Sequence, residues 1–285
     1  MRWSAGNRDN VEDVRGRSGG GIRMGGLGLG GLLVVLLLSW LTGVDFLSLL
    51  GGETVNPGPS ANVPAGELRT TPDEERLVDF VDAVMKDVQE SWQSKLGGRY
   101  QPTRAVIFRD AYPSACGMGQ AATGPFYCPV DQLVYLDLGF FGELRTRFGA
   151  PGDFAQAYVL AHEVGHHVQR LLGVDSQVRQ LQQARPDQAN ALSVRLELQA
   201  DCFAGVWGNQ AAKSGRAAQG KVELEAGDLE EGLNAAAAIG DDRLQRMSGG
   251  RVAPDRFTHG SSEQRVTWFR RGFERGDMST CETFQ

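Results

Sequence analysis

A run of 21 residues without a charged side chain, Met24 to Val44, constrains this chain more than any other feature of its sequence. Its length matches the ~20 residues that a helix needs to cross the hydrocarbon core of a bilayer. Five arginines precede the run, whereas residues 45–68 contain no lysine or arginine, so the positive-inside rule places the N-terminus in the cytoplasm and the rest outside. A cleaved signal peptide is the alternative, but no small-x-small cleavage site follows the run closely.

The apolar run divides the chain into four parts. We expect residues 1–23 to form a cytoplasmic N-terminal segment, residues 24–50 a single transmembrane anchor, residues 51–72 a flexible linker and residues 73–285 a globular domain. The linker contains four prolines and few large apolar side chains, a composition that buries too little surface to fold by itself. The remaining length is within the usual range of a single domain.

The composition is typical of a globular protein and disfavours two other classes, nucleic-acid-binding proteins and small disulfide-rich scaffolds. Hydrophobic residues make up 41% of the chain and charged residues 22%, which is typical of globular proteins. The formal net charge is -6 and the 29 cationic residues are scattered, so we expect no nucleic-acid partner. Four cysteines are too few for a small scaffold held together by disulfides.

Hydrophobic periodicity predicts the α+β class, mostly helical with a small β-sheet. Apolar side chains recur at helical spacing in five segments, and two short β-branched and aromatic runs predict strands. Asp228 with Glu231, and Ser261 with Gln264, have the spacing of capping boxes at the start of the last two helices. The expected helices cover residues 74–92, 154–172, 188–210, 228–245 and a segment after Ser261, and the expected strands cover residues 105–108 and 133–138.

The sequence His162-Glu163-Val164-Gly165-His166 lies inside one of these helices and has the His-Glu-x-x-His spacing of a zinc site. Residues four apart on a helix share a face, so both imidazoles can bind one ion. Glu163 is rotated by about 100° from His162 and can reach a water on that ion. The alternative is a pair of hydrogen-bonded surface histidines, which the apolar stripe on the other side of the helix disfavours.

A catalytic zinc site has three protein ligands and one open position, so a third ligand is needed. Our candidate is Glu197, which lies with Asp201 in the next expected helix. Asp201 shares the face of Glu197 by i, i+4 spacing and can accept the remaining N–H of a zinc-bound imidazole. Both carboxylates lie in a nearly apolar helix, where an unpaired charge is costly and a metal compensates it. A structural salt bridge is the alternative.

Five stretches of the chain match a known pattern: Asn10–Asp13, Tyr158–Gln169, Glu197–Cys202, Ile239–Asp242 and Thr258–Ser262. Together they resemble the bacterial neutral zinc metallopeptidases, membrane-anchored relatives of the zincins. The resemblance implies a zincin-like fold for the metallopeptidase domain, one Zn²⁺ held by His162, His166 and Glu197, and Glu163 as the catalytic carboxylate. With the expected topology, a bacterial protein of this kind would lie in the inner, or cytoplasmic, membrane with its catalytic domain outside the cytoplasm.

The chemistry expected from this site is metal-assisted hydrolysis of a peptide bond. Zinc lowers the pKa of a bound water toward ~7, Glu163 accepts the proton, and the same carboxyl group returns it to the leaving amine. His259 is our candidate for a second donor to the oxyanion, because it lies in a Thr-His-Gly-Ser loop before a capped helix. A histidine that only caps or packs locally is the alternative. Tyr158 could serve instead, although core packing suits it better.

Three polar residues near these motifs receive no role in the site. His167 follows the second histidine ligand but is rotated by about 100° from it, so we expect it not to bind the metal. Asp241 and Asp242 lack the other ligands of a calcium loop, and we interpret them as a solvated helix end.

The four cysteines contain no Cys-x-x-Cys pair, so neither a second zinc site nor a redox motif is supported. A domain outside the cytoplasm can keep disulfides. Of the three possible pairings, we favour Cys116 with Cys128 and Cys202 with Cys281, which ties the C-terminus to the helix that carries Glu197.

The sequence thus predicts a membrane-anchored zinc peptidase that acts on a peptide or protein, and it indicates no oligomeric state. Two alternatives stay open: a zinc-binding envelope protein that binds a partner without catalysis, and a hydrolase for a non-peptide amide or ester. Glu163 favours an enzyme, because a structural zinc site is closed by four ligands and needs no adjacent base. Residues 133–138 are a candidate edge strand for peptide binding, with a core strand as the equal alternative.

Overall fold

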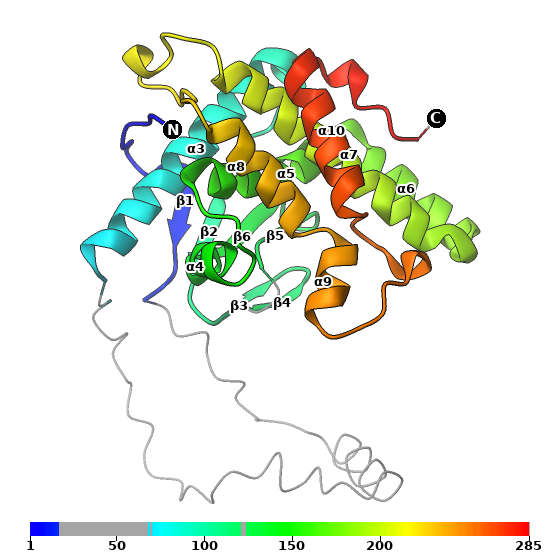
Figure 1. The fold of residues 1–285 in the computed structure, drawn as a ribbon. Coiled ribbons are helices and arrows are strands. Elements are labelled where there is room, and N and C mark those ends of the chain that lie inside the picture. Colours follow the sequence, from blue (N-terminus) through cyan, green and yellow to red (C-terminus); the bar gives the residue numbers. More distant parts are fainter. Residues whose placement is uncertain (17–67, 69, 121–123, 285) are drawn as a thin grey trace, which may run out of the picture. The chain divides into compact units, whose positions relative to one another are not determined.

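The computed structural model describes residues 1–16, 68, 70–120 and 124–284 (Figure 1). After a first strand and a long helix, the described chain contains the other short strands and then a series of helices. The elements are β1 (Val11–Asp13), α3 (Pro72–Leu96), β2 (Ala105–Phe108), β3 (Ala111–Ser114), β4 (Gly117–Gln120), β5 (Phe126–Cys128), β6 (Leu133–Asp137), α4 (Gly139–Thr146), α5 (Asp153–Leu172), α6 (Val174–Ala184), α7 (Ala189–Ala211), α8 (Asp228–Ala238), α9 (Asp241–Met247) and α10 (Ser262–Arg275). The predicted α+β class, rich in helix with small sheets, is confirmed.

The larger sheet has four strands in the order β1-β2-β6-β5, and β3 and β4 form a separate two-stranded sheet. β1, β2 and β6 are parallel, with Val11 opposite Ala105 and Ala105 opposite Val134, whereas β5 runs antiparallel to β6. All residues of β2 are buried, as expected for a central strand. β6 is also interior, so the predicted strand at residues 133–138 belongs to the core, and the edge of the sheet next to it is β5.

The helix α7 packs against both α5 and α10, and these three helices carry most of the polar residues of the candidate site (Figure 1). Glycines let α7 and α10 approach closely. A Cβ atom on Gly272 would lie 1.9 Å from the carbonyl oxygen of Cys202, and one on Gly205 would lie 2.1 Å from that of Phe269. Any side chain at either position would therefore force the two helix backbones apart.

Two of the expected helix boundaries need correction. The expected helix over residues 228–245 is divided into α8 and α9, because the backbone of Gly240 is extended and interrupts it. A Cβ on Gly240 would lie 2.3 Å from the backbone nitrogen of Ser262, so the approach of α10 leaves no room for a side chain there. Asp228 is not a cap: Gly227 precedes α8, and the Asp228 carboxylate accepts the backbone N–H of Glu225 at 2.6 Å.

The other two caps explain where α3 and α10 begin. The capping box predicted for Ser261 and Gln264 at the start of α10 is confirmed. A second capping box, between Thr71 and Glu74, starts α3 at Pro72, the first helical position, where proline is favoured. The helix therefore begins at the last residue of the expected linker.

The first fifteen residues belong to the same unit as the chain from residue 69 onward. The buried Asp82 carboxylate on α3 accepts hydrogen bonds from the backbone N–H of Asn10 at 2.9 Å and from its side-chain amide at 3.0 Å. Arg8 forms an ion pair with Glu75 at 2.7 Å. A domain that starts after the linker therefore omits one strand of the sheet.

The membrane anchor expected at residues 24–50 lies outside the described residues, as does most of the linker expected at residues 51–72. Among the helices that the structure describes, none combines the length and the apolar composition that a membrane crossing requires. The N-terminal segment expected at residues 1–23 is described up to residue 16.

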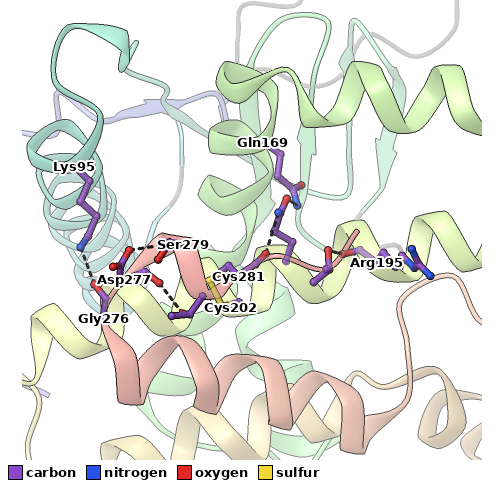
Figure 2. The surroundings of a disulfide bond; sticks show 11 residues. Lys95, Gln169, Arg195, Cys202, Gly276, Asp277, Ser279 and Cys281 are labelled. Carbon is purple, nitrogen blue, oxygen red and sulfur yellow. Dashed lines mark hydrogen bonds between the residues drawn. A yellow bond between two sulfur atoms is a disulfide. The ribbon is translucent and has the colours of Figure 1, made fainter. Parts of the chain in front are cut away.

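Both expected disulfides are present, and no cysteine of the described chain is free. The bond between Cys116 and Cys128 joins the β3–β4 turn to the end of β5. The bond between Cys202 and Cys281 joins α7 to the C-terminal segment (Figure 2). Gln199 on α7 also donates to the Cys281 carbonyl oxygen at 3.0 Å. The C-terminal segment is thereby fixed on the helix that carries Glu197.

Candidate active site and metal centre

The middle of α5 carries His162, Glu163 and His166. The first two are only 5% and 7% exposed, and His166 is partly buried. The helix ends at Gly173, whose φ of 77° lies in the left-handed region that glycine adopts readily, and its end agrees with the helix expected over residues 154–172. The motif therefore lies well inside a regular helix, where side chains four residues apart share a face.

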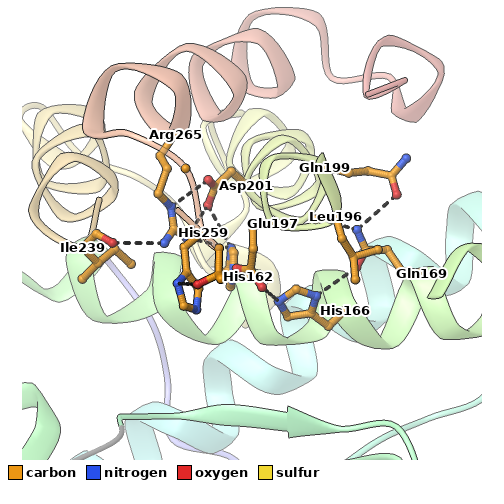
Figure 3. A network of polar contacts seen from close by, with 12 residues as sticks. His162, His166, Gln169, Leu196, Glu197, Gln199, Asp201, Ile239, His259 and Arg265 are labelled. Atoms are coloured by element: carbon orange, nitrogen blue, oxygen red, sulfur yellow. Dashed lines mark hydrogen bonds and ion pairs between the residues drawn. The ribbon is translucent and has the colours of Figure 1, made fainter. Parts of the chain in front are cut away.

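α7 brings Glu197 opposite the two histidines. Its carboxylate oxygens lie 3.1 Å from His162 Nε2 and 3.4 Å from His166 Nε2 (Figure 3). One potential ligand atom from each of these three residues lies within 4.8 Å of the others. Gly165 permits this approach, because a Cβ there would lie 3.0 Å from the carbonyl oxygen of Ala200 on α7. The structure thus brings together the three residues that the sequence predicts as metal ligands.

The Nδ1 atoms of both imidazoles are held by protein acceptors, and both Nε2 atoms face Glu197. His162 Nδ1 lies 2.9 Å from Asp201 Oδ1, and His166 Nδ1 lies 2.9 Å from Gln169 Oε1. Because both partners accept hydrogen bonds, each Nδ1 carries a proton, and each Nε2 binds either a proton shared with the Glu197 carboxylate or, after losing that proton, a metal. Two such nitrogens and the Glu197 carboxylate are the donor set of catalytic zinc sites that keep an open position. The residues therefore fit a zinc ion.

Asp201 is fully buried and is the centre of a polar network behind His162 (Figure 3). It accepts from His162, from the Tyr158 hydroxyl at 2.5 Å, and from two nitrogens of Arg265, each at 2.9 Å. Arg265 lies on α10 and is only 2% exposed. The predicted role of Asp201 as the orienting partner of His162 agrees with this geometry. Tyr158 is buried with its hydroxyl on Asp201, so it is not positioned to donate to a substrate.

Arg265 is the residue of this network that was not predicted from the sequence. It precedes Phe269 by four residues and Gly272 by seven, and all three are buried. An arginine in line with the buried face of a helix was therefore the available signal, because a buried guanidinium requires an anionic partner.

Burial and neighbouring charges give these groups different pKa values. Burial is the largest influence on Glu163 and raises its pKa, although His162 and His166 oppose it. Burial also disfavours the charged form of Glu197, but the same histidines outweigh it and hold the pKa of Glu197 well below its usual range. Burial lowers the pKa of His162, whereas Asp201 and Glu197 together raise it to about 10. The site therefore attracts positive charge, as a proton or as a metal cation.

His259 lies in the loop before α10 and is fixed by Asp241. One oxygen of this carboxylate accepts the backbone N–H groups of Thr258, His259 and Gly260 at 2.7, 2.6 and 3.0 Å, and the other lies 3.2 Å from His259 Nδ1. The interpretation of Asp241 as a solvated helix end is wrong, because its carboxylate is largely buried by these loop contacts. Asp242 accepts from Ser262 and so also belongs to this loop.

The histidine ligands, Glu163 and His259 line one cavity of about 600 Å³. Its other walls are mostly apolar and come from β5, α4, α5 and α9. Two ion pairs, Arg147 with Glu143 and Arg179 with Asp175, also belong to the lining. The wall side chains that give the cavity its apolar character are Phe126, Phe140, Phe148, Val159, Ile239, Leu244 and Met247. The cavity is large enough for several side chains of a bound peptide.

The family of the chain follows from a comparison with protein-family models. The model described as "Putative neutral zinc metallopeptidase" matches residues 1–284. The chain belongs to this zinc metallopeptidase family. The family match includes the segment around β1 as well as the metal-binding helices.

Relatives of the chain occur in Escherichia coli and in Mycobacterium tuberculosis. The chain is 48% identical over 297 residues to a protein of Escherichia coli (strain K12) named "Uncharacterized protein YpfJ", with 100% of this chain and 99% of that protein aligned. It is 43% identical over 223 residues to "Uncharacterized protein Rv2575" of Mycobacterium tuberculosis (strain ATCC 25618 / H37Rv), which covers 76% of this chain and 74% of that protein. No solved structure matches the chain.

Proposed function

We propose that the protein is a zinc-dependent peptidase in which Glu163 is the general base. The observation that carries this proposal is the convergence of His162 Nε2, His166 Nε2 and the Glu197 carboxylate in a cavity that Glu163 also lines. We further propose that the fold is zincin-like, because the metal-binding helix packs against the antiparallel edge strand β5.

Each group of side chains in the site has a separate role in the proposed reaction. Zinc, when bound by the two histidines and Glu197, supplies a Lewis acid that activates water at neutral pH. Glu163 accepts a proton from the attacking water, and the same carboxyl group then donates it to the departing amine. Its raised pKa suits both steps, because a base that ionises nearer to neutral pH also returns the proton more readily. Asp201 keeps the His162 ring oriented throughout.

The edge of β5 is the proposed binding site for the substrate backbone. Among the strands that the structure describes, β5 pairs with β6 alone, so its other edge can add an extended peptide through main-chain hydrogen bonds. Phe126 of β5 lines the cavity together with His162 and Glu163. The apolar walls opposite favour substrates with large apolar side chains next to the scissile bond.

Metal removal tests the proposed function. We expect the purified chain to hold one zinc per molecule, to cleave members of an unbiased peptide library, to lose cleavage on treatment with a chelator and to regain it on addition of Zn²⁺. Metal analysis and mass spectrometry of the products measure these quantities. A chain that holds zinc but cleaves no peptide would contradict the proposal and favour a zinc protein that binds a partner in the cleft. Cleavage of an ester or a non-peptide amide, but of no peptide, would favour a hydrolase for such compounds.

His259 is the proposed second donor to the oxyanion, and it predicts a pH dependence. The hydrogen bond with Asp241 raises the pKa of His259. The protonated imidazole therefore persists to higher pH than in a free histidine, and it is lost as the pH rises through this raised pKa. We expect kcat/KM to fall on this alkaline side and the His259→Gln variant to lose this limb. The variant should lose about 10²-fold or more in kcat/KM with zinc retained. An unchanged profile in the variant would contradict the role.

We propose that Met24–Val44 attaches the protein to the membrane and that the folded unit lies outside the cytoplasm. The length of the apolar run and the two disulfides support this location. The pairing of β1 with β2 adds a constraint, because strands of one sheet lie on the same side of a membrane. A single membrane crossing with a cytoplasmic N-terminus would therefore require β1 to leave the sheet. A second crossing that returns the chain to the first side is disfavoured, because residues 45–68 contain prolines and acidic residues.

Cysteine labelling distinguishes these topologies. No cysteine of the described chain is free, so a cysteine introduced at the exposed Ser4 or Ser214 provides a distinct reactive thiol. We expect a membrane-impermeant maleimide to label Ser4→Cys and Ser214→Cys equally in intact cells made permeable only in the outer envelope. Labelling of Ser214→Cys without Ser4→Cys would show a cytoplasmic N-terminus and hence a sheet without β1.

A further inference from the structure

His167 is completely buried beside the metal-binding motif, yet it is not one of the converging ligands. Its Nε2 lies 2.6 Å from the backbone carbonyl oxygen of Gln101, and its Nδ1 lies 3.0 Å from the Tyr127 hydroxyl. A carbonyl oxygen only accepts hydrogen bonds, so Nε2 carries the proton. Nδ1 is then an acceptor, and the Tyr127 hydroxyl donates to it. The imidazole therefore has both of its nitrogens in use.

Tyr127 is the middle residue of β5, and α5 holds it at two points. Its hydroxyl donates to His167, and its backbone N–H faces the Glu163 carboxylate and lowers the pKa of that group. Glu163 and His167 are four residues apart and share one face of α5. His162 and His166 have the same spacing on an adjacent face, toward Glu197 of α7. The helix α5 thus presents His162 and His166 to α7. It presents Glu163 and His167 to the edge strand β5.

Aromatic packing restrains the imidazole of His167 further. Its ring centre lies 5.5 Å from that of Tyr127 and 5.8 Å from that of Tyr100, both in edge-on arrangements. The Gln101 carbonyl that it contacts belongs to the segment between α3 and β2. His167 therefore joins three parts of the fold and has little freedom to move, which suits a residue that sets the position of another.

We propose that His167 is a positioning residue. Through its hydrogen bond with Tyr127, it fixes the edge strand β5 at the position along α5 where a peptide bound to β5 meets Glu163. The inference rests on the proposed function, because it assigns the edge of β5 to the substrate. His167 itself contacts neither the substrate nor the metal. Its loss should weaken substrate binding while the metal ligands, which face α7, keep their geometry.

Two substitutions of similar size separate the two hydrogen bonds of His167. In His167→Asn, the amide oxygen can reach the region of Nδ1 and accept from Tyr127. In His167→Gln, the longer side chain can reach the region of Nε2 and donate to the Gln101 carbonyl, but Tyr127 loses its acceptor. Both variants leave part of a buried site unfilled, so a general loss of packing should affect them alike. Tyr127→Phe removes the hydroxyl from the other side of the same bond.

Peptide cleavage by the full chain gives the first readout. We expect KM for the best library peptide to rise by about 3- to 10-fold in His167→Gln and Tyr127→Phe, with kcat and zinc content close to wild type. His167→Asn should restore KM to within about 2-fold. The double variant His167→Gln/Tyr127→Phe should be no worse than either single variant, because the two residues share one bond. Equal KM values in the Asn and Gln variants would overturn the proposal.

Amide hydrogen exchange gives a second readout that needs no substrate. We expect the amides of Phe126–Cys128 to exchange about 3- to 10-fold faster in His167→Gln than in His167→Asn, because β5 opens more readily without its anchor. Equal exchange of these amides in the two variants would overturn the role of His167. A wild-type chain that binds zinc but cleaves nothing would count against the proposed function alone, since the exchange comparison would still decide whether His167 holds β5.

Discussion

Glu163→Gln should reduce kcat for peptide cleavage by about 10²- to 10⁴-fold while zinc stays bound at one ion per chain. Glutamine has the same size as glutamate but cannot accept the proton of the attacking water or return it to the amine. Glu163 is not among the three converging ligand atoms, so its replacement leaves the metal site intact. The hydrogen bond between Tyr127 and His167 does not involve Glu163, so β5 should keep its place in this variant.

His162→Gln is the contrasting variant, because it removes a ligand from the same turn of α5. It should lose both zinc and cleavage, whereas Glu163→Gln loses cleavage alone. Single-turnover rates with metal analysis on the same samples measure both effects. Cleavage by Glu163→Gln within about 3-fold of wild type would exclude Glu163 as the general base, because such a small loss is far below the contribution of a positioned base.

The convergence of the candidate metal ligands was predictable in part because their geometry is local. Residues four apart on one helix meet whatever the rest of the fold does, so His162 and His166 follow from the sequence alone. Glu197 and Asp201 required a second argument, the cost of two carboxylates in an apolar helix, and the structure places both against α5. The two disulfides were the favoured one of three possible pairings, and both are present.

Contacts between distant segments were not predictable in the same way. β1 pairs with β2 across more than ninety residues, and nothing in a three-residue strand indicates its partner. Asp241 looks like a helix end in the sequence, and only the loop that folds over it supplies the three N–H groups that bury it. Gln169 reads as an ordinary helical residue until α7 is in place, when its amide donates to the Leu196 carbonyl and its oxygen meets His166.

Arg265→Met should cause the largest loss of stability among the changes considered. The guanidinium makes two hydrogen bonds of 2.9 Å with Asp201, and both side chains are buried. Removing one partner of a buried ion pair leaves the other charge without compensation, which costs about 3–5 kcal/mol. Urea unfolding with the disulfides intact measures the free energy of unfolding. We expect zinc affinity to fall as well, by about 10- to 100-fold, because Asp201 orients His162.

Arg270→Met provides the matched control, because Arg270 lies on the same helix and is exposed. It removes the same charge and leaves the same side chain, and its free energy of unfolding should stay within about 0.5 kcal/mol of wild type. Arg265→Lys keeps the charge but cannot reproduce the paired hydrogen bonds to Asp201, so it should lie between the two in stability. If Arg265→Met were as stable as Arg270→Met, Asp201 would not need the guanidinium. The orientation of His162 would then depend on Tyr158 and Asp201 alone, and α10 would have no part in holding the metal site.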